Sequence, residues 1–198
     1  MIDALHELLD VQGLIAWGGI FGITGIIFVE TGLFFGFFLP GDSLLVTAGI
    51  LAAAGELNIL ALVTFPALAA IAGDQTGYAI GYRAGSALRS RYGRFEKQLD
   101  RAHSFYEKYG AKTIVLARFV PVVRTFVPAV AGAARMSYRT FVTYNVIGGL
   151  LWVLSTSLLG YTVGSLIPNI SRYLHFVILV VVVLSLLPAV YEWYKHRG

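Results

Sequence analysis

The feature that most constrains this chain is a set of long runs without a charged side chain. The longest extends from Thr140 to Ser171, and a helix that crosses a bilayer needs about 20 predominantly apolar residues. Charged residues make up 13% of the 198 residues, about half the share of a soluble domain. Because a helix satisfies its own backbone hydrogen bonds in lipid, the sequence predicts an all-α integral membrane protein.

Four apolar segments are long enough to cross the membrane. The predicted spanning helices cover residues 13–31, 57–82, 138–166 and 172–193. Two further apolar stretches, 43–55 and 113–134, are too short or too mixed to cross. We therefore predict that these two stretches are re-entrant helical hairpins, which enter and leave the membrane on the same side.

The hydrophilic middle of the chain predicts the orientation. Residues 83–112 contain eight basic and three acidic residues, and such an excess is typical of a cytoplasmic segment. With this segment inside, the first hairpin opens to the exterior, the second opens to the cytoplasm, and both termini are cytoplasmic. The same segment is expected to form amphipathic helices on the inner leaflet. A solvated connecting loop is an equal alternative.

This arrangement predicts a single membrane domain, residues 1–198, built from two inverted repeats. The first repeat is 31–82 with the external hairpin, and the second is 113–166 with the cytoplasmic hairpin; the helix at 172–193 follows. Within the hairpins, Asp42–Gly49 loosely resembles Arg124–Gly132. Inverted repeats whose broken helices meet near the membrane midplane are typical of secondary transporters.

Four charged residues lie inside these apolar segments: Glu30, Asp42, Arg118 and Arg124. Such a charge costs at least about 2.5 kcal/mol at the bilayer centre, so it commonly faces a polar cavity or pairs with another charge. Four residues near these charges are predicted to break the hairpins: Pro40, Gly41, Pro121 and Pro128. The pattern favours a polar site at mid-membrane, and therefore transport.

An ordered set of motifs resembles the DedA family of membrane proteins. The first half carries Glu30-Thr-Gly and Phe38-Leu-Pro-Gly-Asp-Ser-Leu-Leu45, then Gly73-Asp74. The second half carries Arg118-Phe-Val-Pro-Val-Val-Arg-Thr-Phe-Val-Pro128 and then Ala131-Gly132, Met136-Ser-Tyr138, Tyr144-Asn-Val-Ile-Gly148 and Leu151-Trp152. The similarity covers roughly residues 25–165. More distantly, the chain resembles eukaryotic lipid scramblases that share the same domain.

The resemblance implies lipid translocation across the bacterial cytoplasmic membrane. Undecaprenyl phosphate, or a phospholipid such as phosphatidylethanolamine, is the implied cargo, and the activity is linked to the proton motive force. The important acidic residues of the family fall on Glu30 and Asp42, and its important arginines fall on Arg118 and Arg124. The chain shows no departure at these four positions.

The residues themselves are suited to these roles. Arginine pairs with phosphate through two parallel hydrogen bonds, so Arg118 and Arg124 are the predicted headgroup ligands. Glu30 and Asp42 would hold these arginines when no lipid is bound, and one carboxylate would exchange a proton. An alternative is that the four charges form permanent ion pairs that only brace the hairpins.

Two further polar residues, Asp74 and Asn145, are candidates for lining the pathway. Helix capping or helix–helix hydrogen bonding is the alternative for both. Glycines are spaced four apart in three places: Gly18 with Gly22; Gly77, Gly81 and Gly85; and Gly160 with Gly164. This spacing favours close packing inside the molecule over dimerisation.

Two other functions compete with lipid transport. A proton-coupled transporter of ions or small solutes could use the same cavity, although two arginines suit an anionic cargo better. A membrane lipid phosphatase would need histidine as nucleophile, and the four histidines lie at predicted helix ends or in the loop. The sequence therefore predicts no enzymatic activity, cofactor, metal or nucleic acid partner. It leaves the oligomeric state open, a homodimer included.

Overall fold

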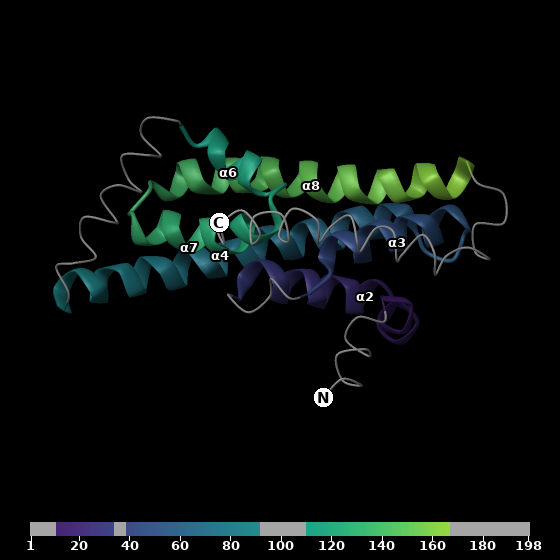
Figure 1. Ribbon diagram of the computed structural model, residues 1–198, viewed down its shortest axis with the longest axis horizontal. Coiled ribbons are helices and arrows are strands. Elements are labelled where there is room, and N and C mark those ends of the chain that lie inside the picture. The colour runs from purple at the N-terminus through teal and green to yellow at the C-terminus, as the bar shows by residue number, and fades with distance from the viewer. Residues whose placement is uncertain (1–10, 34–38, 92–109, 167–198) are drawn as a thin grey trace, which may run out of the picture. The chain divides into compact units, whose positions relative to one another are not determined.

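The computed structural model describes residues 11–33, 39–91 and 110–166. In these residues every regular element is a helix (Figure 1), which confirms the predicted all-α class for this part of the chain. The helices are α2 (Val11–Gly32), α3 (Gly41–Ala53), α4 (Ile59–Arg91), α6 (Lys112–Ala117), α7 (Pro121–Ala133) and α8 (Tyr138–Leu166). The predicted helix at 172–193 and most of the predicted amphipathic segment lie outside the described residues.

Two helices, α4 and α8, are long and apolar enough to cross a membrane by length and composition. The bounds of α8 agree with the predicted span 138–166. For α4 the predicted end at residue 82 was wrong, because the helix continues to Arg91. Residues 83–91 are rich in arginine and alanine and contain no proline, so they extend the helix beyond its apolar part.

The first described helix, α2, is not one regular helix. Gly19 has φ 49° and ψ −142° inside it, a conformation that glycine adopts at little cost because it has no β-carbon. The predicted span 13–31 is therefore interrupted near its start. The apolar helix that follows the kink, Gly18–Gly32, is shorter than a full crossing requires.

The two predicted hairpins each contain a helix of 13 residues, α3 and α7. Pro40 immediately precedes α3, of which Gly41 is the first residue, and Pro121 is the first residue of α7. Proline suits such positions because the first turn of a helix has no partner for its N–H groups. These three residues therefore lie at helix starts, where a break was predicted.

The prediction for Pro128 was wrong, because Pro128 lies inside α7 and the helix continues through it. Proline removes one hydrogen bond from the helix interior. Pro128 packs closely on α4, since a β-carbon built on Gly77 would lie 3.3 Å from its β-carbon. The α6–α7 segment bends at residues 118–120 instead.

The chain divides into two compact units. Of the described residues, the first comprises 11–27, 39–67 and 153–166, and the second comprises 28–33, 68–91 and 110–152. Each of the helices α2, α4 and α8 is divided, so that one part belongs to the first unit and the other part to the second.

In the first unit α3 packs closely on the second half of α8. A β-carbon on Gly160 would meet the backbone of Val46, and one on Gly164 would lie 3.0 Å from the α-carbon of Ile50. Because the contacts advance in the same direction along both helices, α3 and α8 run parallel. Gly49 completes the contact on the α3 side, where a β-carbon would lie 2.9 Å from the backbone nitrogen of Tyr161.

In the second unit α7 packs in the same way on α4. A β-carbon on Gly81 would meet the backbone of Ala129, and one on Gly85 would lie 2.7 Å from the α-carbon of Ala133. These contacts also advance together, so α7 and α4 run parallel. Gly132 corresponds to Gly49 of the first unit: a β-carbon built on Gly132 would lie 2.8 Å from the backbone nitrogen of Tyr82. The predicted internal packing role of the spaced glycines is confirmed for α4 and α8.

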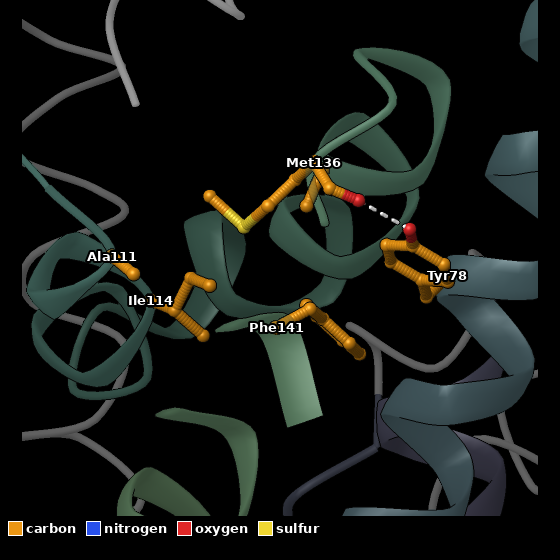
Figure 2. Packing of buried hydrophobic residues seen from close by; sticks show 6 residues of the cluster. Tyr78, Ala111, Ile114, Met136 and Phe141 are labelled. Atoms are coloured by element: carbon orange, nitrogen blue, oxygen red, sulfur yellow. Dashed lines mark hydrogen bonds between the residues drawn. The ribbon is translucent and has the colours of Figure 1, made fainter. Parts of the chain in front are cut away.

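The first half of α8 lies antiparallel to α4 in the second unit. The amide of Asn145 reaches the backbone of Ile71, while Phe141, one turn earlier in α8, stacks on Tyr78 with ring centres 4.5 Å apart. This end of the unit is closed by a core of Tyr78, Ala111, Ile114, Ala131, Met136 and Phe141 (Figure 2). The core joins α4, α6, α7 and α8, and thereby sets the position of the α6–α7 break.

Candidate functional site

The second unit brings together five buried polar or charged residues. They come from the end of α2, from α4, from the α6–α7 segment and from α8: Glu30, Asp74, Arg118, Arg124 and Asn145. None is more than 7% exposed. Charged side chains are seldom buried this deeply unless they are paired, and the pairs found here define the site.

Arg118 follows α6 directly, at the start of the break before α7. Its Nη2 forms an ion pair with Asp74 of α4 and donates a hydrogen bond of 2.7 Å to Oδ1 of Asn145 on α8. The backbone carbonyl of Ala70 lies 3.5 Å from the same nitrogen. The other terminal nitrogen, Nη1, is buried and makes no hydrogen bond to the described protein atoms.

Asn145 and the glycines that follow it on α8 line the space that the guanidinium of Arg118 occupies. Asn145 accepts from Arg118 and donates through Nδ2 to the carbonyl of Ile71, at 3.1 Å. A β-carbon on Gly149 would lie 3.1 Å from Nη1 of Arg118, so any larger residue would crowd the arginine. Asn145 thus makes a helix–helix hydrogen bond and also orients the cation.

Arg124 occupies the first turn of α7 and forms an ion pair with Glu30, near the end of α2. Its guanidinium carbon lies 4.5 Å from the ring centre of Trp152, which is 1% exposed. The guanidinium carbon of Arg118 lies 6.0 Å from the same ring. Trp152 therefore lies beside both arginines, within the range in which a cation is attracted to an aromatic face.

Glu30 and Asp42 were predicted as the carboxylate partners of the two arginines. Glu30 pairs with Arg124, and Arg118 pairs with Asp74, which the sequence had suggested only for lining the pathway. Asp42 lies in the first turn of α3 and belongs to the first unit. Its proposed part in a shared site with Arg124 stays a prediction.

Sequence reasoning missed the role of Trp152, which it noted as part of the family motif Leu151-Trp152. The sequence did contain a signal for this role. Asn145, Gly149 and Trp152 are spaced i, i+4 and i+7, so they lie on the same face of one helix. No comparable signal links Asp74 to Arg118, which is 44 residues away. That pair requires the fold.

The site contains two guanidinium groups, each paired with one carboxylate. Guanidinium groups remain charged and offer paired donors that match phosphate or carboxylate. Among the described residues no group of three or more histidine, cysteine, aspartate or glutamate side chains could hold a metal ion.

Comparison with known proteins identifies the family of this chain. The VTT domain profile matches residues 39–162, which include Asp42, Asp74, both arginines and Trp152. The chain is 49% identical to Protein DedA of Escherichia coli over 98% of its length and 89% of that protein. It is 43% identical to an uncharacterized membrane protein of Mycobacterium tuberculosis, over 95% of this chain and 87% of that one.

A third relative is less similar. The inner membrane protein YqjA of Escherichia coli is 35% identical over 70% of this chain and 64% of YqjA. No solved structure matches the chain. The matched domain and the extent of identity show that this chain belongs to the DedA family of VTT-domain membrane proteins.

Proposed function

We propose that this protein moves a phosphate-bearing lipid across the bacterial cytoplasmic membrane and does not catalyse a reaction. Undecaprenyl phosphate, or a phospholipid such as phosphatidylethanolamine, is the proposed cargo, with coupling to protons. The observation that carries the proposal is the pair of buried arginines beside Trp152. Two guanidinium groups within one compact unit suit a single phosphate headgroup better than a metal cation.

The buried Nη1 of Arg118 supports a binding role for this arginine. A buried donor without a partner costs about 1–3 kcal/mol, whereas Nη2 of the same group is held by Asp74 and Asn145. An arginine that only braced the fold would gain from partners at both nitrogens. A headgroup oxygen is a suitable acceptor for Nη1.

The glycine-mediated packing of α3 on α8 and of α7 on α4 supports the proposed inverted repeats. In each unit the short helix of one repeat runs parallel to the long helix of the other repeat. The same packing motif thus occurs once in each unit. Two repeats related by a two-fold axis would produce this pattern. We propose that both short helices belong to re-entrant hairpins, one opening to each side of the membrane, as in transporters with broken helices.

Lipid transport can be tested in proteoliposomes that contain a fluorescent phospholipid in both leaflets. The wild-type protein should expose inner-leaflet lipid to an external quencher faster than protein-free vesicles do. Arg124→Gln alone leaves the Glu30 carboxylate buried without its counter-ion and should lose stability. The double variant Glu30→Gln with Arg124→Gln removes that stranded charge. It should abolish this acceleration while the purified protein keeps its expression level and melts closer to wild type than Arg124→Gln does. Equal loss of folding and transport would instead favour the alternative in which the ion pairs only brace the hairpins.

The rival function is a proton-coupled transporter of ions or small solutes. It is tested on the same vesicles, loaded with a pH-sensitive dye and exposed to cation gradients. We expect no cation-dependent proton flux above that of protein-free vesicles. Flux in the absence of lipid movement would decide for the rival.

A further inference from the structure

The end of α7 has a backbone conformation that is unusual for the residue found there. Arg135 has φ 56° and is the only non-glycine residue with positive φ among the described residues. It follows the last turn of α7, where its N–H donates to the carbonyl of Gly132 and the N–H of Met136 donates to the carbonyl of Ala131. This is the Schellman helix ending, in which the residue with positive φ is usually glycine.

The chain itself provides the comparison, because α3 ends in the same way. There the residue with positive φ is Gly55, at φ 84°. Its N–H donates to the carbonyl of Ala52, and the N–H of Glu56 donates to the carbonyl of Leu51. Two helices of equal length thus end in one motif, with glycine in α3 and arginine in α7. A strained residue that persists where glycine would fit indicates a functional role for its side chain.

The side chain of Arg135 is exposed and directed to an aromatic surface. Its guanidinium carbon lies 6.0 Å from the ring centre of Tyr82, which is 47% exposed. Tyr82 stacks on Tyr78, and Tyr78 also contacts the ring of Tyr138. The hydroxyl of Tyr78 donates to the carbonyl of Met136, which anchors the turn that carries Arg135 (Figure 2).

Among the described residues, the exposed charges at this end of the second unit are all basic. Lys112 begins α6, and Arg139 lies in the first turn of α8; both are exposed. The described carboxylates of this unit are Glu30 and Asp74, which are buried and paired with Arg124 and Arg118. Exposed tyrosines beside exposed basic residues are typical of the membrane–water interface.

We infer that Arg135, Tyr82 and Arg139 form a binding site for the headgroup of an anionic phospholipid in the cytoplasmic leaflet, distinct from the buried arginine site. The ring of Tyr82 supports one face of the guanidinium, so its N–H edge remains available for a phosphate. Arg139 and Lys112 add positive charge at the same surface. The predicted cytoplasmic side of residues 83–112 places this surface at the leaflet where anionic lipid is recognised.

We expect two opposite effects from Arg135→Gly, which gives α7 the ending found in α3. In zwitterionic phosphatidylcholine nanodiscs the variant should melt at a higher temperature than wild type, because the strain at φ 56° is relieved. Adding phosphatidylglycerol should raise the melting temperature of wild type and should raise that of the variant much less. We expect phosphatidylglycerol affinity, measured by titration into nanodiscs, to fall about fivefold.

One matched variant completes the experiment. Arg135→Lys keeps both the charge and the strain, and should retain most of the response to phosphatidylglycerol. Neither substitution touches the buried arginine site, so failure of the proposed transport function would not affect this result. An undiminished phosphatidylglycerol response in Arg135→Gly would overturn the inference. A lower melting temperature of Arg135→Gly in phosphatidylcholine would also overturn it, since Arg135 would then be held by a partner within the chain.

Discussion

Arg124 lies over the face of Trp152, with its guanidinium carbon 4.5 Å from the ring centre. Trp152 is almost completely buried and also lies near Arg118. One indole thus lies beside two buried cations, each of which also pairs with a carboxylate. The aromatic face and the carboxylates together lower the cost of burying two arginines in the same unit.

Replacing Trp152 with leucine should therefore affect both arginines. Leucine fills much of the space but offers no π face, so we expect a loss of about 1–2 kcal/mol for the buried cation–π contacts, in addition to a packing cost. Thermal unfolding in detergent measures the change. Trp152→Phe keeps an aromatic face and should lose less; if both variants lost the same stability, packing alone would account for the effect.

The ion pair between Arg118 and Asp74 should show strong coupling. Asp74→Asn leaves a buried guanidinium without its counter-ion, and breaking a buried pair in this way typically costs about 3–5 kcal/mol. The double variant Arg118→Met with Asp74→Asn removes the stranded charge and should be more stable than Asp74→Asn alone. A double-mutant cycle by reversible unfolding tests this. Additive effects would contradict a direct interaction.

Asn145 should contribute through orientation as well as stability. Asn145→Ala removes the acceptor for Arg118 and the donor to Ile71, and we expect a loss of about 1.5–3 kcal/mol for the hydrogen bond to a charged group. Asn145→Asp keeps an acceptor for Arg118 and should bind it more strongly. Lipid transport by Asn145→Asp compared with Asn145→Ala measures the orienting role, and equal transport by the two would argue against it.

The glycine contacts should be equally sensitive in both units. Gly81→Ala and Gly160→Ala each place a β-carbon against the backbone of the parallel helix, and overpacking of this kind typically costs about 1–3 kcal/mol. Gly25→Ala is the matched control, because a β-carbon at this position would have nothing within 4 Å. In this control alanine should be neutral or stabilising by up to about 1 kcal/mol. Tolerance of both core substitutions would refute the close packing.

The two helix endings also allow the reverse substitution, in which arginine replaces the glycine that ends α3. Gly55→Arg gives α3 the residue that α7 carries, at φ 84°. A positive φ at a non-glycine residue costs about 1–3 kcal/mol, so this variant should melt at a lower temperature than wild type in any lipid. An unchanged melting temperature would show that this conformation is not strained in this protein.

Much of the local structure followed from sequence because its causes are local. The uncharged run that begins at Thr140 predicted a spanning helix over 138–166, which agrees with α8, since length and hydrophobicity decide whether a helix can lie in lipid. Pro40 and Pro121 were predicted to break the hairpins, and both lie at helix starts, because proline restricts its own backbone wherever it occurs. Pro128 was mispredicted as a break, because α7 continues through it. The end of α4 was mispredicted because the helix continues through residues 83–91, beyond its apolar part.

By itself the sequence determined the helical membrane class, the family motifs and the presence of buried charges at Glu30, Arg118 and Arg124. Only the tertiary structure decided that Arg118 pairs with Asp74, that Trp152 serves both arginines, and that Arg135 takes a conformation suited to glycine. The first two are relations between residues far apart in the chain. Because pairing of buried charges depends on distances of a few ångströms, it is set by how the helices pack, and the order of residues along the chain does not specify it.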